Sequence, residues 1–218
     1  MAVRKVADGV FAVTASDKRI QCFENLFPVP EGAAYNSYVI ADEKTAVLDG
    51  ADAAVADEFM DGVECVLGGR PLDYIVVNHL EPDHSAALGC LIKKHPEAEL
   101  VGNAKTKAMA GLYLDPERVA GMRVVADGET LSLGARALTF VTTPMVHWPE
   151  SMVAYSKEDG ILFAQDAFGA FGSTAVCSTT KRTSTLGTSR TCAVITPTSW
   201  VSSARRSPPC LKKSPRST

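Results

Sequence analysis

The chain has 218 residues, of which 22 are Lys or Arg and 25 are Asp or Glu, so its formal net charge is -3. Its hydrophobic content of 46% is typical of a soluble globular protein with one domain, or one and a half. The apolar runs are shorter than the ~20 residues of a transmembrane helix, and the first residues lack the apolar core of a signal peptide. We therefore expect no membrane partner and a cytoplasmic location. The six cysteines are scattered without a CxxC pair, which argues against a zinc ribbon or a dithiol redox centre.

The charge is unevenly distributed along the chain. Residues 1–172 contain all 25 acidic residues and 14 basic ones, a charge of -11, whereas residues 173–218 contain 8 basic and no acidic residues, a charge of +8. The second segment is rich in Ser and Thr and lacks helical or strand periodicity, which is typical of a segment that buries too little apolar area to fold. We expect 1–172 to form the folded domain and 173–218 to be a basic Ser/Thr-rich tail, disordered or out of frame. Because its basic residues are dispersed and do not alternate with aromatic residues, we expect no nucleic acid partner.

The predicted elements of the first segment run from hairpins through strand–helix alternation and back to hairpins. Short apolar or alternating runs predict strands over 10–13, 35–40, 45–49, 74–77, 99–102, 122–125, 131–133, 137–141, 152–155 and 161–164. Helices are predicted over 52–67, from 85 onward, and over 103–114, with Gly68 as a stop and Asn103 as an N-cap. Asp159-Gly160 predicts a tight turn between the last two strands. This order favours an α/β fold with a two-sheet core and helices packed outside it.

Ligand-type side chains are concentrated directly after the strand predicted over 74–77. The segment His79-Leu80-Glu81-Pro82-Asp83-His84 places two imidazoles and two carboxylates within six residues. Such crowding costs Coulomb repulsion and desolvation unless a cation is present, and mixed nitrogen and oxygen donors are a metal-ligand set. His147 and Asp166 follow two later predicted strands, and side chains at successive strand ends converge on one edge of a sheet. His95, alone in its loop, is expected to lie outside the site.

The donor set favours iron over zinc. Position 81 is Glu, where a zinc hydrolase loop of similar design offers His, and a harder, more anionic site suits iron because it stabilises the oxidised states. The carboxylate of Asp166 has two oxygens with which it can bridge two metals. These features indicate redox chemistry on a small molecule rather than hydrolysis.

Several segments resemble the di-iron domain of the flavodiiron proteins. They are His79-x-Glu81-x-Asp83-His84, residues 143–152 (TPMVHWPESM), residues 161–169 (ILFAQDAFG) and, nearer the N-terminus, residues 32–38 (GAAYNSY). The resemblance runs from about residue 3 to residue 172. It implies the αββα sandwich of the metallo-β-lactamase superfamily, incomplete at the C-terminus. It also implies an oxidoreductase that reduces dioxygen to water or nitric oxide to nitrous oxide at a non-haem di-iron centre.

The resemblance also implies a role for each ligand. One iron is assigned to His79, Glu81 and His147, the second to Asp83 and His84, and Asp166 bridges both. The family places one more His on the second iron, downstream of Asp166, but no His follows His147 here, so the second site is expected to lack one ligand. No further catalytic or cofactor-binding residue is expected, and Trp148 and Tyr35 are expected to be core aromatic residues.

In the family, electrons arrive from rubredoxin-like or other donors through FMN, which a following flavodoxin-like domain holds, usually across a head-to-tail homodimer. The resemblance stops where the acid-free segment begins, so we expect a truncated or frameshifted end, no FMN domain, and little sustained reductase activity from the isolated chain. Two alternatives stay open: a zinc hydrolase of the metallo-β-lactamase fold, such as a thioester hydrolase, and a non-catalytic metal-binding module.

Overall fold

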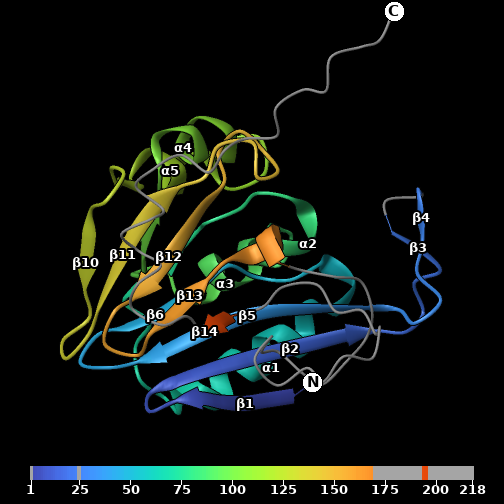
Figure 1. Cartoon of the computed structure of the whole chain (residues 1–218), viewed down its shortest axis with the longest axis horizontal. Helices are drawn as coiled ribbons and strands as arrows, with labels where there is room; N and C mark the ends of the chain where they lie inside the picture. The colour runs from blue at the N-terminus through green and yellow to red at the C-terminus, as the bar shows by residue number, and fades with distance from the viewer. Residues whose placement is uncertain (1, 24–25, 169–192, 196–218) are drawn as a thin grey trace, which may run out of the picture.

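The computed structural model of the protein describes residues 2–23, 26–168 and 193–195 (Figure 1). Within these residues, two β-sheets pack face to face, and helices cover the outer face of the larger sheet. The larger sheet has the strand order β1-β2-β5-β6-β7-β8-β9, and the smaller one the order β10-β11-β12-β13-β14. The predicted two-sheet core with outer helices is therefore confirmed.

The elements have the following bounds. The larger sheet consists of β1 (Ala2–Ala7), β2 (Val10–Asp17), β5 (Ala33–Ala41), β6 (Thr45–Leu48), β7 (Tyr74–Val76), β8 (Glu99–Gly102) and β9 (Arg123–Val124). The smaller sheet consists of β10 (Thr130–Ser132), β11 (Ala137–Thr142), β12 (Met152–Ser156), β13 (Ile161–Phe163) and β14 (Ala193–Ile195). A separate hairpin contains β3 (Cys22–Phe23) and β4 (Phe27–Pro28). The helices are α1 (Ala56–Leu67), α2 (Pro82–Ser85), α3 (Leu88–Lys94), α4 (Ala104–Ala110) and α5 (Pro116–Ala120), with 3₁₀ turns η1 (Ala53–Val55) and η2 (Gln165–Phe168).

Local differences from the predicted elements have identifiable causes. The helix that starts after Asn103 ends at Ala110, not at Leu114, and a separate helix α5 follows. Helix α5 begins here because the Asp115 side chain accepts a hydrogen bond from the amide of Glu117 and a proline occupies the first helical position. The edge strand β1 was not predicted, because it is defined by its antiparallel pairing with β2 rather than by an alternating sequence.

Only part of the segment 173–218 lies within the described residues. There, β14 pairs antiparallel with β13, although no strand was predicted in this range. The rest of the segment lies outside the described residues, so the boundary at 172 and the out-of-frame origin of the tail stay predictions. In the part of the chain that is described, no helix has the length and apolarity needed to cross a membrane.

The core divides into two clusters because the central strands are buried on both faces. In β6, Ala46 and Leu48 point toward the smaller sheet, whereas Val47 belongs to the cluster under the helices. From α1, Phe59 and Val63 enter that cluster with no exposed surface. Burial of each such large side chain contributes about 1.5–3 kcal/mol. The helix ends as predicted at Gly68, which adopts the left-handed conformation with φ 57°.

Parallel pairing sets the position of the chemical groups. Strands β6, β7, β8 and β9 are mutually parallel, so their C-terminal ends lie at the same edge of the larger sheet. The acidic and imidazole side chains that follow β6 and β7 therefore meet at this edge, which is the usual location of a binding site in such sheets.

At the opposite end of the sandwich, Arg136 joins turns of both sheets. Its guanidinium lies 3.0 Å from Asp159 Oδ2 and 3.2 Å from Asp42 Oδ2, and it donates a hydrogen bond of 2.8 Å to the carbonyl of Asp8. The side chain of Arg136 is only 12% exposed, and those of the two carboxylate partners are 9% and 10% exposed. Removal of the Arg136 guanidinium would leave the nearly buried carboxylates of Asp42 and Asp159 without their positively charged partner.

We therefore expect Arg136→Met to lower the free energy of unfolding by about 3 kcal/mol, the cost of breaking a buried charge network. Lys44→Met is the matched control, because Lys44 is half exposed in its pair with Asp73 and should leave stability almost unchanged. Urea unfolding followed by circular dichroism measures both variants. Equal stability of R136M and K44M would contradict a stabilising charge network at Arg136.

Candidate metal centre

The segment that follows β7 turns through a short helix rather than an open loop. We predicted a loop over 79–84 with a helix from Ser85, but a short helix, α2, spans Pro82–Ser85, and the predicted helix starts only at Leu88, as α3. A proline fits the first helical position because its missing N–H has no partner to lose there. The Ser85 hydroxyl donates to the carbonyl of Leu80 at 2.8 Å, and the carbonyl of His84 accepts from the amide of Gly50 at 2.7 Å. These bonds hold the ligand-bearing segment as a rigid, buried unit.

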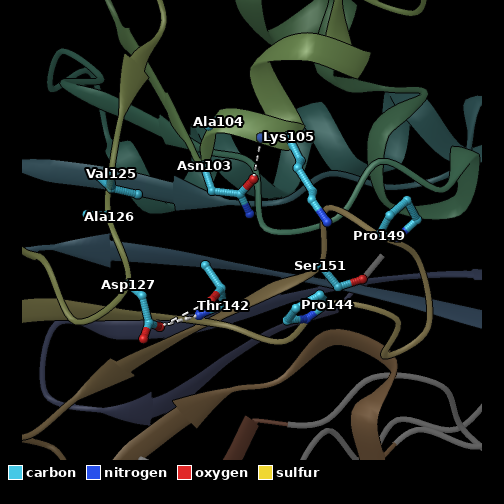
Figure 2. Close-up of a pocket in the computed structure, with 10 residues that line it drawn as sticks. All are labelled: Asn103, Ala104, Lys105, Val125, Ala126, Asp127, Thr142, Pro144, Pro149 and Ser151. Carbon is cyan, nitrogen blue, oxygen red and sulfur yellow. Dashed lines mark hydrogen bonds between the residues drawn. The ribbon is translucent and has the colours of Figure 1, made fainter.

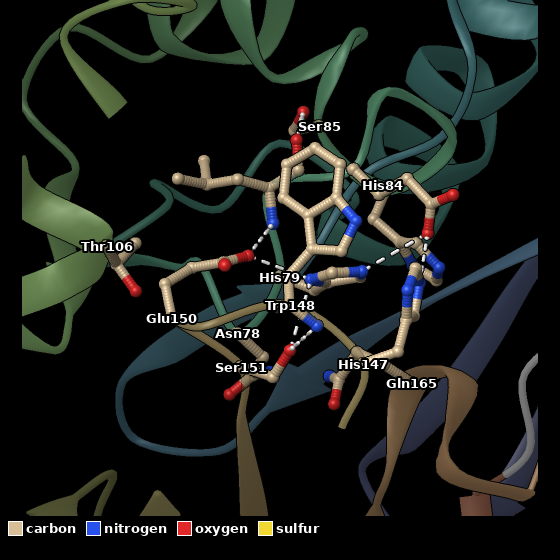
Figure 3. A network of polar contacts seen from close by, with 12 residues as sticks. Asn78, His79, His84, Ser85, Thr106, His147, Trp148, Glu150, Ser151 and Gln165 are labelled. Atoms are coloured by element: carbon tan, nitrogen blue, oxygen red, sulfur yellow. Dashed lines mark hydrogen bonds and ion pairs between the residues drawn. The ribbon is translucent and has the colours of Figure 1, made fainter. Parts of the chain in front are cut away.

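The first donor group gathers side chains from three parts of the chain (Figure 3). His79 Nε2 lies 3.2 Å from Glu81 Oε2 and 3.4 Å from Asp166 Oδ2. His147 Nε2 lies 2.7 Å from the same Glu81 oxygen and 3.4 Å from the same Asp166 oxygen. Their donor atoms all lie within 4.8 Å of one another. Two donors that bind one metal at about 2.1 Å and at right angles are about 3 Å apart, so these spacings fit a shared ion.

The second donor group contains Asp83, His84 and Asp166, also within 4.8 Å of one another. His84 Nε2 lies 3.1 Å from Asp166 Oδ1 and 3.6 Å from Asp83 Oδ2. Asp166 thus directs Oδ1 to the second group and Oδ2 to the first. All four histidines of the sequence lie in described residues, and the second group holds a single imidazole. The arrangement fits two metal ions that share one carboxylate, with fewer nitrogen donors at the second.

The electrostatics of the site favour added positive charge. Burial by itself lowers the pKa of His79, but its hydrogen bonds to Asp166, Glu150 and Glu81 outweigh burial and raise the pKa to about 11. Burial also lowers the pKa of His84, and the carboxylates of Asp83 and Asp166 overcome it and raise the pKa to about 9. The buried carboxylates therefore attract either protons or metal ions to this site.

Asp49, which sequence reasoning missed, links the segments that carry the ligands. Its Oδ1 accepts hydrogen bonds from the amides of Asn78 (2.7 Å) and His79 (3.2 Å). Its Oδ2 accepts from Asn78 Nδ2 (3.0 Å) and Gln165 Nε2 (2.5 Å). Burial raises the pKa of Asp49 despite these bonds and the nearby His84. The available signal was its position directly after an apolar strand, the same signal that marked the ligands after β7.

Glu150 was also missed as a functional residue. It is fully buried, and its Oε1 lies 2.9 Å from His79 Nδ1 and accepts a hydrogen bond of 2.9 Å from the amide of Leu80. Burial raises the pKa of this carboxyl, but the hydrogen bonds from His79 and Leu80 outweigh burial and lower it below its usual range. Nothing in the sequence around Glu150 marked it as buried against an imidazole.

Three further residues named from the sequence, all with aromatic rings, lie in different parts of the fold. Tyr35 is a buried core residue, as expected. The ring of Trp148 also packs on the core but lies 5.4 Å from the ring of His79, edge to face, so it borders the site. His95 lies elsewhere, 2.8 Å from Glu64 Oε1 on the helical side of the protein.

A pocket of about 270 Å³ lies beside this network (Figure 2). Its lining comprises Asn103, Ala104, Lys105, Val125, Ala126, Asp127, Thr142, Pro144, Pro149 and Ser151. Ser151 also lies 3.5 Å from His79 Nδ1 through its hydroxyl. None of the candidate ligands lines the pocket, so it is separate from the donor groups.

Comparisons with known proteins identify the family. A family model described as ODP family beta lactamase matches residues 33–188, which extends past the boundary predicted at 172. The rubredoxin-oxygen oxidoreductase of Megalodesulfovibrio gigas is 37% identical over 170 residues, which cover 78% of this chain and 42% of that protein. The nitric oxide reductase of Moorella thermoacetica is 34% identical over 173 residues, which cover 78% of this chain and 43% of that protein.

The crystal structure of the flavodiiron protein from Giardia intestinalis is similar to this fold, with a TM-score of 0.76 and 31% sequence identity. The match covers 84% of this chain and 44% of that one. The chain thus spans less than half the length of these relatives. The expected resemblance and the metallo-β-lactamase-like α/β fold are confirmed. The chain therefore belongs to the ODP β-lactamase family, which it shares with the flavodiiron proteins.

Proposed function

We propose that residues 1–172 form an iron-binding oxidoreductase domain that reduces dioxygen to water or nitric oxide to nitrous oxide. The single observation that carries this proposal is the sharing of Asp166: its two oxygens face two donor groups of mixed imidazole and carboxylate. Relatives named rubredoxin-oxygen oxidoreductase and nitric oxide reductase support the reaction class.

In this proposal each side chain has a defined task. His79, Glu81 and His147 would hold one iron, Asp83 and His84 would hold the other, and Asp166 would contribute to both. The chemistry that ferrous ions would supply at these residues is reduction of the diatomic molecule. The protein keeps the ions adjacent, and its carboxylates stabilise their oxidised states because anionic oxygen donors favour the higher charge.

Access to the site is proposed to lie on the side of His147. The side chain of His147 is 48% exposed, whereas those of His79 and His84 are almost fully buried. Its neighbours Met145 and Val146 are exposed apolar residues. An apolar rim admits a small uncharged gas more readily than a charged solute.

The electron supply and the assembly are proposals drawn from the family. Electrons come from a rubredoxin-like or similar donor through FMN, which a flavodoxin-like domain holds, across a head-to-tail dimer. The cytoplasm is the proposed location. The tests below also distinguish this function from that of a zinc hydrolase and from that of a non-catalytic metal-binding module.

Iron content tests the shared carboxylate. The protein reconstituted anaerobically with ferrous iron is expected to retain roughly two irons per chain after desalting, as a dinuclear site does. Asp166→Ala should lose most of both, whereas His147→Ala should lose mainly the first. His95→Ala, which removes a histidine outside the site, should retain the wild-type content. Unchanged iron in D166A, measured by plasma mass spectrometry, would contradict a shared ligand.

Reaction with the gases tests the chemistry. The ferrous protein, mixed in a stopped-flow instrument with dioxygen or nitric oxide, is expected to be oxidised, and His147→Ala should slow this by at least about tenfold because one ion loses its accessible ligand. His95→Ala should react like the wild type. A protein that ignores both gases but hydrolyses a thioester with zinc bound would be a hydrolase. One that binds metal substoichiometrically and does neither would be a binding module.

The pH dependence of metal uptake follows from the raised pKa values. The folded-state pKa values of His79 and His84 lie above the ordinary 6.5, so the imidazolium forms stabilise the metal-free fold fully below pH 6.5. This stabilisation is lost as the pH rises through about 9 for His84 and about 11 for His79. Metal binding requires neutral imidazole and should release these protons, so affinity for Zn²⁺ should rise by about tenfold per pH unit for each proton released. Calorimetry in buffers of different ionisation enthalpy counts the protons; an affinity independent of pH between about 7 and 9 would contradict the assigned ligands.

A further inference from the structure

Glu150 occupies a fixed position behind the first donor group. It lies just before β12, and Figure 3 shows its carboxylate directed at the ring of His79 from the side opposite His147 and His84. Its backbone carbonyl accepts a hydrogen bond of 2.6 Å from Asn103 Nδ2. The Asn103 side chain is itself fixed, because its oxygen caps α4 at the amides of Lys105 and Thr106. The backbone of Glu150 is therefore anchored independently of the proposed metal ligands.

In the neutral form of His79, which is the form that binds a metal, the contact determines which nitrogen carries the proton. An ionised carboxylate only accepts hydrogen bonds, so the 2.9 Å contact between Glu150 Oε1 and His79 Nδ1 requires the proton on Nδ1. Ser151 Oγ is a weaker alternative partner at 3.5 Å. With Nδ1 protonated, the neutral ring presents a lone pair at Nε2, the atom that faces Glu81 and Asp166.

The buried charge of Glu150 exceeds what a purely structural role requires. Its Oε1 already accepts from two donors, while its Oε2 is buried without a hydrogen-bond partner among the described residues. A half-satisfied buried carboxylate is costly, whereas an amide of the same shape supplies the Oε1 contacts without a charge. A positive charge on the far side of His79 offsets this cost, because the imidazole transmits the polarisation from one nitrogen to the other.

We propose that Glu150 is a positioning residue for the metal centre: it holds the His79 proton on Nδ1, fixes the plane of the ring and makes Nε2 a stronger metal donor. This inference rests on the proposed metal centre and assigns a role to a residue outside the ligand set. Carboxylates that accept from a metal-bound imidazole typically change metal affinity by about 10- to 100-fold.

The experiment uses the whole chain with ¹⁵N-labelled histidine and Zn²⁺ as a redox-inert probe. Zinc affinity is measured by competition with a chromophoric chelator, and long-range ¹H–¹⁵N NMR spectra report the tautomer of each ring. Glu150→Leu removes the acceptor, and Glu150→Gln keeps the shape and the acceptor oxygen without the charge. Glu64→Leu is the matched control, since it removes a His–Glu contact that lies outside the site, the one at His95.

The zinc-bound wild type is expected to show His79 with its single proton on Nδ1. E150L should bind zinc about 10- to 100-fold more weakly, and its His79 Nδ1–H resonance should lose the downfield shift of the hydrogen bond to Glu150. E150Q should keep the tautomer, shift the Nδ1–H resonance upfield and bind zinc several-fold more weakly, and E64L should change neither quantity at the site. If E150L does not fold, E150Q decides the question alone. E150Q with wild-type affinity and an unshifted resonance would overturn the role of Glu150, whereas a wild type that takes up no Zn²⁺ would overturn the proposed metal centre and this inference with it.

Discussion

The buried carboxylate of Asp49 is the interaction on which the geometry of the site depends. It stands at the end of β6 and accepts hydrogen bonds from Asn78 and His79 at the end of β7 and from Gln165 after β13. Since β7 and β13 belong to different sheets, this one side chain fixes the ligand segment of the larger sheet against that of the smaller. Asp49 thus holds the backbone amide of His79 and the side chain of Gln165, the residue before Asp166, and so brings His79 and Asp166 together. The sandwich is thus closed at one end by Asp49 and at the other by Arg136.

The chemistry follows from an excess of carboxylates gathered in a place where water is scarce. Each imidazole in the buried part of the site contacts at least one carboxylate, and the pKa values of His79 and His84 rise although burial opposes this. A protein keeps so much like charge together only when a cation offsets it. The fold contributes the framework and the charge, and the division of Asp166 between the two donor groups is the feature on which the proposed two-ion centre rests.

Much of the fold was predictable because its signals are local. Gly68 ends α1 and Asn103 caps α4 for reasons that lie within a few residues of each. The six candidate ligands were also predictable, since each follows an apolar strand or matches a family segment, and the structure brings them together. Their role as iron ligands stays a prediction. Asp49 follows an apolar strand, but its contact with Asn78, 29 residues away, is not encoded locally. Glu150 was missed because its partner His79 lies 71 residues away and no local pattern marks the contact. The segment around Pro82 was predicted as a loop because proline is common in loops as well as in the first turn of a helix.

Anomalous diffraction from crystals of the iron-loaded protein tests the central claim most directly. The account predicts a pair of iron peaks in each chain, both in contact with Asp166. The first peak should contact His79, Glu81 and His147, and the second should contact Asp83 and His84. A single peak, or a pair that does not share Asp166, would contradict a dinuclear centre built on this carboxylate.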